Sequence, residues 1–304
     1  MTASRYGIFR DELYYLACGE HLGWGYVDQP PLIALVAWIA RHLFGDSLVG
    51  LRFFPALAGA ATVWLTGKIT RELGGGAFAQ VLAALAVICV PIYLVMHHWL
   101  TMNAFEPLLW LACIWCIART INGNDLLYWI WFGVFAGLAM ETKYTIAFFV
   151  FALVLALLFT RERRFLATKE FWVGAALALL IFLPNLIWLA RHNFPFLELM
   201  HNIRQTHRDV VRGPIAFLLD QAQIMNPVLF PLWLGGLIWL FFGRFRLLGI
   251  VYAVLLVTLI VLRGKNYYLA SIYPVLFAAG GIAFEQITIS RFKWSRVVYV
   301  LLLV

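Results

Sequence analysis

Apolar residues occur along this chain in long blocks, and the breaks between the blocks predict its secondary structure. From residue 53 onward, apolar runs of roughly fifteen to twenty residues alternate with short polar connections. Runs of that length cross a hydrocarbon layer of about 30 Å as helices. We therefore expect an all-α, polytopic bundle of transmembrane helices. The expected spans lie near 53–67, 77–95, 101–118, 127–140, 144–160, 171–190, 226–242, 247–262 and 267–284, and a tenth begins at 297.

Composition supports a membrane protein over a soluble one. Hydrophobic residues make up 63% of the 304 residues and charged residues only 12%, whereas soluble domains carry about 25% charged residues. We expect one transmembrane domain over residues 1–304. Its N-terminal segment has no span before it and residues 297–304 begin a new apolar run, so we expect the first span and a C-terminal part to be missing from the chain.

The net charge of +8 is explained by membrane orientation. Twelve of the 23 lysine and arginine residues lie in alternate short connections, at 67–73, 118–123, 160–170, 243–246 and 290–296. Basic short loops face the cytoplasm. The chain is thus expected in the cytoplasmic (inner) membrane, with the other connections on the extracytoplasmic side, and a nucleic-acid partner is not expected.

Three segments on the expected outer side suit helices that lie flat at the membrane boundary. Residues 5–22 and 32–45 have amphipathic or short apolar patterns, and interfacial Trp24 and Tyr26 lie between them. The loop at 191–225 is long, basic and amphipathic. Such helices place an apolar face in the lipid and polar groups in water.

Acidic residues gather at the start of the chain. Asp11 and Glu12 are adjacent, so on a helix they point about 100° apart, and one can face a cavity while the other contacts a partner. Asp28 lies just before Pro30–Pro31, where helical backbone is disfavoured. These residues are candidates for catalysis at the membrane boundary; the alternative is that they are ordinary solvated acids.

Two further candidates lie where spans meet the outer side. Glu106 is expected one to two turns inside a span, where a carboxylate must be paired or face a polar cavity. His97 and His98 lie nearby, so a divalent metal is possible, although adjacent histidines cannot both face one site from a regular helix. Lys143 forms either an exposed ion pair with Glu141 or a phosphate contact in a cavity.

Basic and aromatic residues line the remaining outer connections. Arg263 and Lys265 close one span, and Tyr268 begins the next; Arg191 ends another. Arginine makes forked contacts with phosphate oxygens, and lysine supplies a point charge. Side chains that reach for the interface give a similar pattern.

Acids and bases that converge at one face indicate transfer from a lipid phosphate, because an acid can take a proton from an acceptor while cations hold the leaving phosphate. The main alternative is a multi-span transporter or flippase, and a non-catalytic scaffold is a third. Transporters carry polar groups near the bilayer midplane, whereas the central parts of these spans are nearly free of ionisable residues.

Three stretches resemble the membrane-embedded glycosyltransferases of the GT-C architecture. They are "RDELYY", "GYVDQPPL" and "GKNYYLASIYPVLFAAGG", and the likeness runs from about residue 5 to 290. The group that the chain resembles is bacterial family 39, the dolichyl-phosphate-mannose protein mannosyltransferase-like enzymes, which are related to the lipid A aminoarabinose transferases. The resemblance implies a polyprenyl-phosphate sugar donor and an extracytoplasmic acceptor, whether protein, lipid or glycan.

The resemblance also assigns roles to residues. The Asp of an Asp-Glu pair in the first outer loop is taken as the catalytic base, which implies Asp11 with Glu12. An "E-K-P-P" stretch that holds the donor phosphate matches "DQPP", with Asp28 as the acid and Gln29 where lysine is common. A "T-D-x-P" acid is replaced by Met102, and we expect Glu106, four residues on, to supply that carboxylate from the same helix face.

Overall fold

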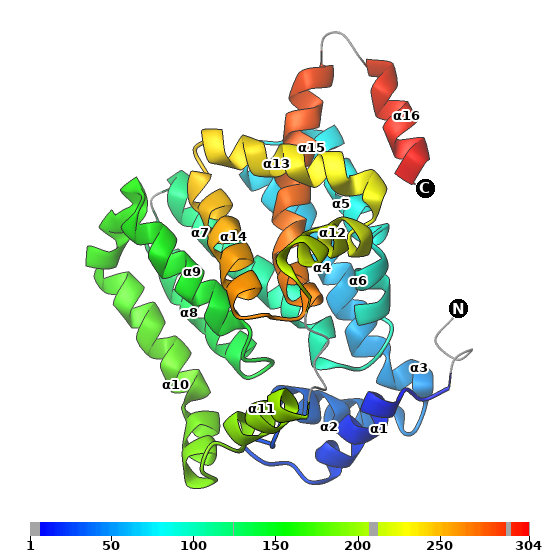
Figure 1. Ribbon diagram of the computed structural model, residues 1–304, viewed down its shortest axis with the longest axis vertical. Helices are drawn as coiled ribbons and strands as arrows, with labels where there is room; N and C mark the ends of the chain where they lie inside the picture. Colours follow the sequence, from blue (N-terminus) through cyan, green and yellow to red (C-terminus); the bar gives the residue numbers. More distant parts are fainter. Residues whose placement is uncertain (1–6, 124, 207–211, 290–292, 304) are drawn as a thin grey trace.

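The computed structural model describes residues 7–123, 125–206, 212–289 and 293–303. Helices and the connections between them account for this part of the chain, which confirms the all-α bundle expected from the apolar pattern (Figure 1). The expected interfacial segment at 5–22, the loop at 191–225 and the basic connection at 290–296 each lie partly outside the described residues.

The helices of the bundle follow the expected spans. They are α4 (Phe53–Glu72), α5 (Ala77–Ile88), α6 (Pro91–Met96), α7 (Glu106–Gly123), α8 (Leu127–Met140), α9 (Ile146–Leu158), α10 (Lys169–Arg191), α13 (Phe230–Phe242), α14 (Arg246–Val261), α15 (Tyr273–Thr288) and α16 (Lys293–Leu303).

Fewer of these helices than expected are long enough to cross a membrane by length and composition. Among the described residues, four qualify, and a fifth span results if the bent pair α12–α13 counts as one. Proline explains part of the difference, because Pro91 at the start of α6 divides the expected span 77–95 in two. Helices α8 and α9 have 14 and 13 residues and are joined by a tight turn.

Short helices lie across one end of the bundle. Figure 1 shows α1, α2, α3 and α11 below the long helices, and α12 beside them. Helix α12 is bent by 97° relative to the pair of α13 and the 3₁₀ turn η3. The bounds are α1 (Arg10–Glu20), α2 (Leu32–Phe44), α3 (Leu48–Leu51), α11 (Pro195–Gln205) and α12 (Pro214–Ile224), with 3₁₀ turns η1 (Met102–Ala104), η2 (Arg161–Ala167), η3 (Pro227–Leu229) and η4 (Asn266–Ile272).

Glycines allow two helix pairs to pack backbone against backbone. A Cβ on Gly133 of α8 would lie 2.0 Å from the carbonyl oxygen of Gly174 in α10, and a Cβ on Gly236 of α13 would lie 2.0 Å from that of Leu276 in α15. Small residues of this kind are typical of helix contacts inside membranes, where close packing replaces the hydrophobic effect.

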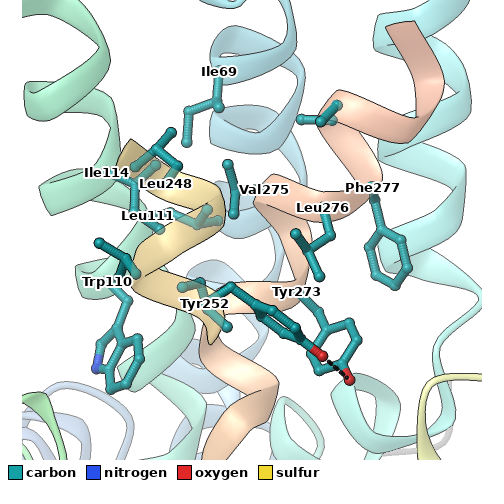
Figure 2. Packing of buried hydrophobic residues seen from close by; sticks show 14 of the residues in the cluster. Ile69, Trp110, Leu111, Ile114, Leu248, Tyr252, Tyr273, Val275, Leu276 and Phe277 are labelled. Carbon is teal, nitrogen blue, oxygen red and sulfur yellow. Dashed lines mark hydrogen bonds between the residues drawn. The ribbon is translucent and has the colours of Figure 1, made fainter. Parts of the chain in front are cut away.

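The centre of the bundle is apolar, with one satisfied polar pair. Side chains from α7, α14 and α15 interlock there, and the hydroxyls of Tyr252 and Tyr273 lie 3.0 Å apart (Figure 2). Both tyrosines are buried. Because each hydroxyl has the other as a partner, the pair avoids the cost of an unpaired polar group in an apolar interior.

Basic connections meet at the end of the bundle opposite α1 and α2 (Figure 1). Glu72, the last residue of α4, forms an ion pair with Arg119 of α7 at 3.3 Å and accepts a hydrogen bond from Asn122. Arg244, between α13 and α14, donates to the carbonyl of Ile121 at 2.6 Å. Three connections that the sequence places on one side of the membrane are therefore neighbours in the fold.

Candidate functional site

Lys143 stands at the centre of a buried polar cluster below the long helices. It lies in the turn between α8 and α9, and its Nζ is 2.8 Å from Glu106 Oε2 and 2.9 Å from Asn103 Oδ1. The same ammonium group lies 4.5 Å from the ring centre of Tyr268 and 5.3 Å from that of Tyr267. Aromatic faces attract cations, so both rings stabilise the charge.

Glu106 owes its position to the start of α7. It is the first residue of this helix, and Pro107 follows in the first turn, where a missing N–H costs nothing. A carboxylate at a helix N-terminus is stabilised by the helix dipole. Its second oxygen accepts a hydrogen bond from the Thr145 hydroxyl. The exposed Lys143–Glu141 pair considered from the sequence does not form, because Lys143 turns toward Glu106.

Asp11 and Asp28, which we call the acidic group, both act on the Tyr15 phenol, and Asp11 forms an ion pair with Arg10 at 3.2 Å. The Tyr14 hydroxyl donates to Asp28 Oδ1 at 2.6 Å. Burial raises the pKa of the neighbouring Tyr15 phenol, and the charges of Asp11 and Asp28 raise it further. Tyr15 and Glu106 in turn both interact electrostatically with Tyr267. The structure therefore brings Asp11, Asp28, Glu106 and Lys143 to one end of the bundle.

Glu12 points away from the acidic group into a buried ion pair. Its carboxylate lies 2.7 Å from Arg52 Nη2, and it accepts hydrogen bonds from the amides of Phe9 and Leu100. Burial alone would raise the pKa of Glu12, but Arg52 and the two amides lower it below its ordinary value. This pair fixes α1 to the start of α4, so it sets the place of the adjacent Asp11.

Residues 21–31, which we call the acid loop, connect α1 to α2 and carry Asp28. The loop is fastened to α10, where Asn185 donates to the carbonyl of Trp24 at 2.7 Å and accepts from the Tyr144 hydroxyl at 3.0 Å. Gly25 permits the close approach, because a Cβ there would lie 2.5 Å from the Trp188 ring. The amide of Leu32, just after the loop, donates to the carbonyl of Glu141 at 3.0 Å.

The other predicted basic residues lie outside the cluster. Arg191, at the end of α10, and Arg263 and Lys265, before η4, are exposed. Among the described residues, no hydrogen bond or ion pair joins these three side chains to Glu106 or Asp28. Their predicted contact with the donor phosphate stays a prediction.

The histidines do not build a metal site within the described part of the chain, where no three His, Cys, Asp or Glu side chains are grouped closely enough to hold an ion. Burial lowers the pKa of His97 to about 4, so this ring is neutral. A hollow of about 700 Å³ between α13 and α15 has no charged residue in its lining, and one of about 380 Å³ lies between α1 and α2. Neither is lined by Asp11, Asp28, Glu106 or Lys143.

Sequence reasoning missed Arg52 and Asn185, which hold the acids in place. Arg52 looked like one of many residues near a span start, and its partner Glu12 lies 40 residues away. Asn185 had a detectable signal, because it is an amide in the middle of an apolar run, directly after Pro184. Polar residues in such runs face the bundle interior.

The comparisons with known proteins identify the family. Residues 28–188 match the family of dolichyl-phosphate-mannose-protein mannosyltransferases. The chain belongs to this family. The matched region includes Asp28, Glu106 and Lys143, so the family assignment covers most of the cluster described above.

Two curated relatives match parts of the chain. The polyprenol-phosphate-mannose–protein mannosyltransferase of Corynebacterium glutamicum is 27% identical over 199 residues, 55% of this chain and 38% of the relative. The lipid A galacturonosyltransferase RgtD of Rhizobium johnstonii is 26% identical over 231 residues, 73% of this chain and 47% of the relative. The chain thus spans less than half the length of either.

Solved structures confirm the GT-C fold. ArnT from Cupriavidus metallidurans, bound to undecaprenyl phosphate, superimposes with a TM-score of 0.77 over 96% of this chain and 58% of ArnT, at 19% identity. The same protein in the apo state gives a TM-score of 0.71 over 94% of this chain and 56% of ArnT, at 18% identity. The expected all-α transmembrane architecture is therefore correct.

Proposed function

We propose that this protein is a membrane glycosyltransferase that moves a sugar from a polyprenyl-phosphate donor to an acceptor hydroxyl on the extracytoplasmic side. One observation carries the proposal: a buried lysine, paired with Glu106 and framed by two tyrosine rings, lies at the same end of an apolar bundle as Asp11 and Asp28, which both act on the Tyr15 phenol. An ammonium group in that setting suits a phosphate, and the aspartates suit a hydroxyl that must lose its proton. The undecaprenyl phosphate bound by the structural relative ArnT supports the same donor class.

Lys143 is the group that meets the donor phosphate. In the structure its charge is balanced by Glu106, and Tyr267 and Tyr268 cover it. A phosphate that approaches adds a second anion to the same lysine, so Glu106 sets how strongly the phosphate is held. Three exposed side chains supply secondary contacts with the phosphate as it arrives and leaves: Arg191, Arg263 and Lys265.

Asp11 is the base of the reaction, and Asp28 completes the acidic group. The acceptor oxygen forms a bond with the anomeric carbon while the bond from that carbon to the phosphate oxygen breaks. The acceptor proton passes to Asp11, and the electron pair of the broken bond leaves with the phosphate toward Lys143. A single displacement of this kind inverts the anomeric centre. Glu12 supports the step by holding α1 through Arg52.

The two ends of the bundle support the extracytoplasmic side. The basic connections around Glu72, Arg119 and Arg244 meet at one end, and α1, α2 and the α8–α9 turn lie at the other (Figure 1). Because basic short loops stay in the cytoplasm, the proposed site opens on the opposite side. The acceptor is a protein, a lipid or a glycan with a free hydroxyl.

The test is sugar transfer in membranes that hold the full-length protein and a labelled polyprenyl-phosphate sugar. We expect label on an acceptor with the wild type and a loss of at least a hundredfold with Asp11→Asn. Asp46→Asn is the matched control, because Asp46 is a surface acid paired with Arg41. Full turnover in Asp11→Asn contradicts the role of Asp11. Unmodified label that crosses the membrane instead identifies a transporter.

A further inference from the structure

Glu141 is a buried carboxyl group that the mechanism above does not use. It caps the end of α8, two residues before Lys143, and it is 8% exposed. Both of its side-chain oxygens are buried, and neither has a hydrogen-bond partner among the described residues. Unsatisfied buried groups in native proteins call for a functional explanation.

The charges around Glu141 disfavour its ionised form. The nearest cation along the chain, Lys143, is committed to Glu106 and Asn103. The acid loop brings Asp28 to the same neighbourhood, since Glu141 and Asp28 both act on the Tyr144 phenol. From α10, the uncharged Asn185 accepts a hydrogen bond from Tyr144, three residues after Glu141. An ionised Glu141 is therefore buried and without a hydrogen-bond partner among the described residues, and both conditions favour the protonated acid.

The turn that holds Glu141 is also the anchor of the acid loop. The main-chain carbonyl of Glu141 accepts from the amide of Leu32, and Tyr144 holds Asn185, which in turn holds Trp24. A charge on Glu141 is relieved by movement of this residue toward water, and its main-chain carbonyl holds the amide of Leu32 at the end of the loop. Ionisation of Glu141 and docking of the acid loop thus oppose each other.

We propose that Glu141 is a positioning residue that works as a neutral acid: it keeps the acid loop docked on the Lys143 turn, and its ionisation releases the loop. The position of Asp28, which the loop carries, is then sensitive to pH. The link to catalysis rests on the proposed transferase function, whereas the docking itself does not.

Hydrogen–deuterium exchange of the peptide that covers residues 21–31 tests the docking in the full-length protein in nanodiscs. Burial raises the pKa of Glu141 to about 8. After correction for intrinsic exchange, we expect wild-type protection of the loop to fall up to about tenfold per pH unit above that value. Glu141→Gln keeps the shape without the charge and is expected to stay protected. Glu198→Gln, which removes an exposed acid from α11, is the control and behaves as the wild type.

The outcomes separate this inference from the proposed function. The inference is overturned if loop protection depends on pH equally in the wild type and in Glu141→Gln. It is also overturned if the loop of Glu141→Gln is unprotected at neutral pH. If no variant transfers sugar, the exchange experiment still decides the role of Glu141. If transfer occurs, its rate in the wild type falls above about pH 8 while that of Glu141→Gln does not.

Discussion

The ammonium group of Lys143 lies 2.8 Å from a carboxylate oxygen of Glu106, although the two residues are 37 positions apart in the chain. The α8–α9 turn and the first residue of α7 meet to form this pair. Because both side chains are buried, the pair is screened little by water. It therefore holds a buried cation at the place where the proposed function requires one for the donor phosphate.

Loss of the Glu106 charge is expected to slow transfer. Glu106→Gln keeps a hydrogen bond to Lys143 but removes the balancing charge, so Lys143 is held less firmly and binds the released phosphate too strongly. We expect a decrease of about tenfold or more in kcat, with KM for the donor unchanged or lower. Initial rates at several donor concentrations measure this. Glu198→Gln is the control, and wild-type kcat in Glu106→Gln rules out the role of Glu106.

The buried Glu12–Arg52 pair is expected to dominate the stability of α1. Removal of one partner leaves a buried charge without compensation, which costs about 3–5 kcal/mol. Glu12→Gln should thus lower the melting temperature in detergent far more than Asp46→Asn at the surface. Because the pKa of Glu12 is lowered in the fold, its stabilisation is present above the ordinary value and is lost as the pH falls below it. A variant as stable as the wild type contradicts this assignment.

Glu141 makes stability depend on pH in the opposite direction to Glu12. Its pKa rises from 4.5 to about 8 in the folded protein, so folding takes up a proton between these values and stability falls as the pH rises through this range. Glu141→Gln removes that dependence. We expect the variant to be more stable than the wild type by about 3–5 kcal/mol at pH 8 and by little at pH 4.5. Thermal melting across this range measures the difference, and a gap that does not change with pH argues against a buried neutral acid.

A methyl group on Gly25 in the acid loop should shift Asp28, which the loop carries, relative to Lys143. In Gly25→Ala the new Cβ would lie 2.5 Å from the Trp188 ring and 2.7 Å from Asn185 Nδ2, so the loop must shift away from α10. We expect a lower transfer rate and faster hydrogen exchange in residues 21–31. Gly23→Ala is a matched control two residues away, because its Cβ would meet only a carbonyl oxygen at 3.6 Å. Equal effects of the two substitutions would show that the close contact is unimportant.

The comparison of sequence and structure shows which features local patterns reveal. Apolar blocks located the helices because a membrane imposes length and composition on each span. Glu106 was recognised because a carboxylate inside a span needs a partner. The partner itself, Lys143, was not assigned, because the neighbouring Glu141 offered an ion pair at shorter sequence distance.

The pattern of apolar and polar residues could not predict which side chains pair over long sequence distances. Glu12 resembled a second catalytic acid beside Asp11, whereas its carboxylate is held by Arg52, 40 residues away. The two adjacent acids differ in burial because α1 turns one side toward α4 and the other toward the acid loop. Such differences depend on how helices pack, which a single sequence does not encode in any local motif.

The short helices that carry Lys143 have a consequence for the surrounding lipid. Helices α8 and α9 have 14 and 13 residues, which corresponds to roughly 20 Å at 1.5 Å per residue, compared with a hydrocarbon layer of about 30 Å. A hydrophobic length this small draws the two leaflets toward each other around the protein. Headgroups next to the α8–α9 turn are then lowered toward the lysine, which under the proposed function shortens the path of a lipid-linked sugar from its leaflet to the site.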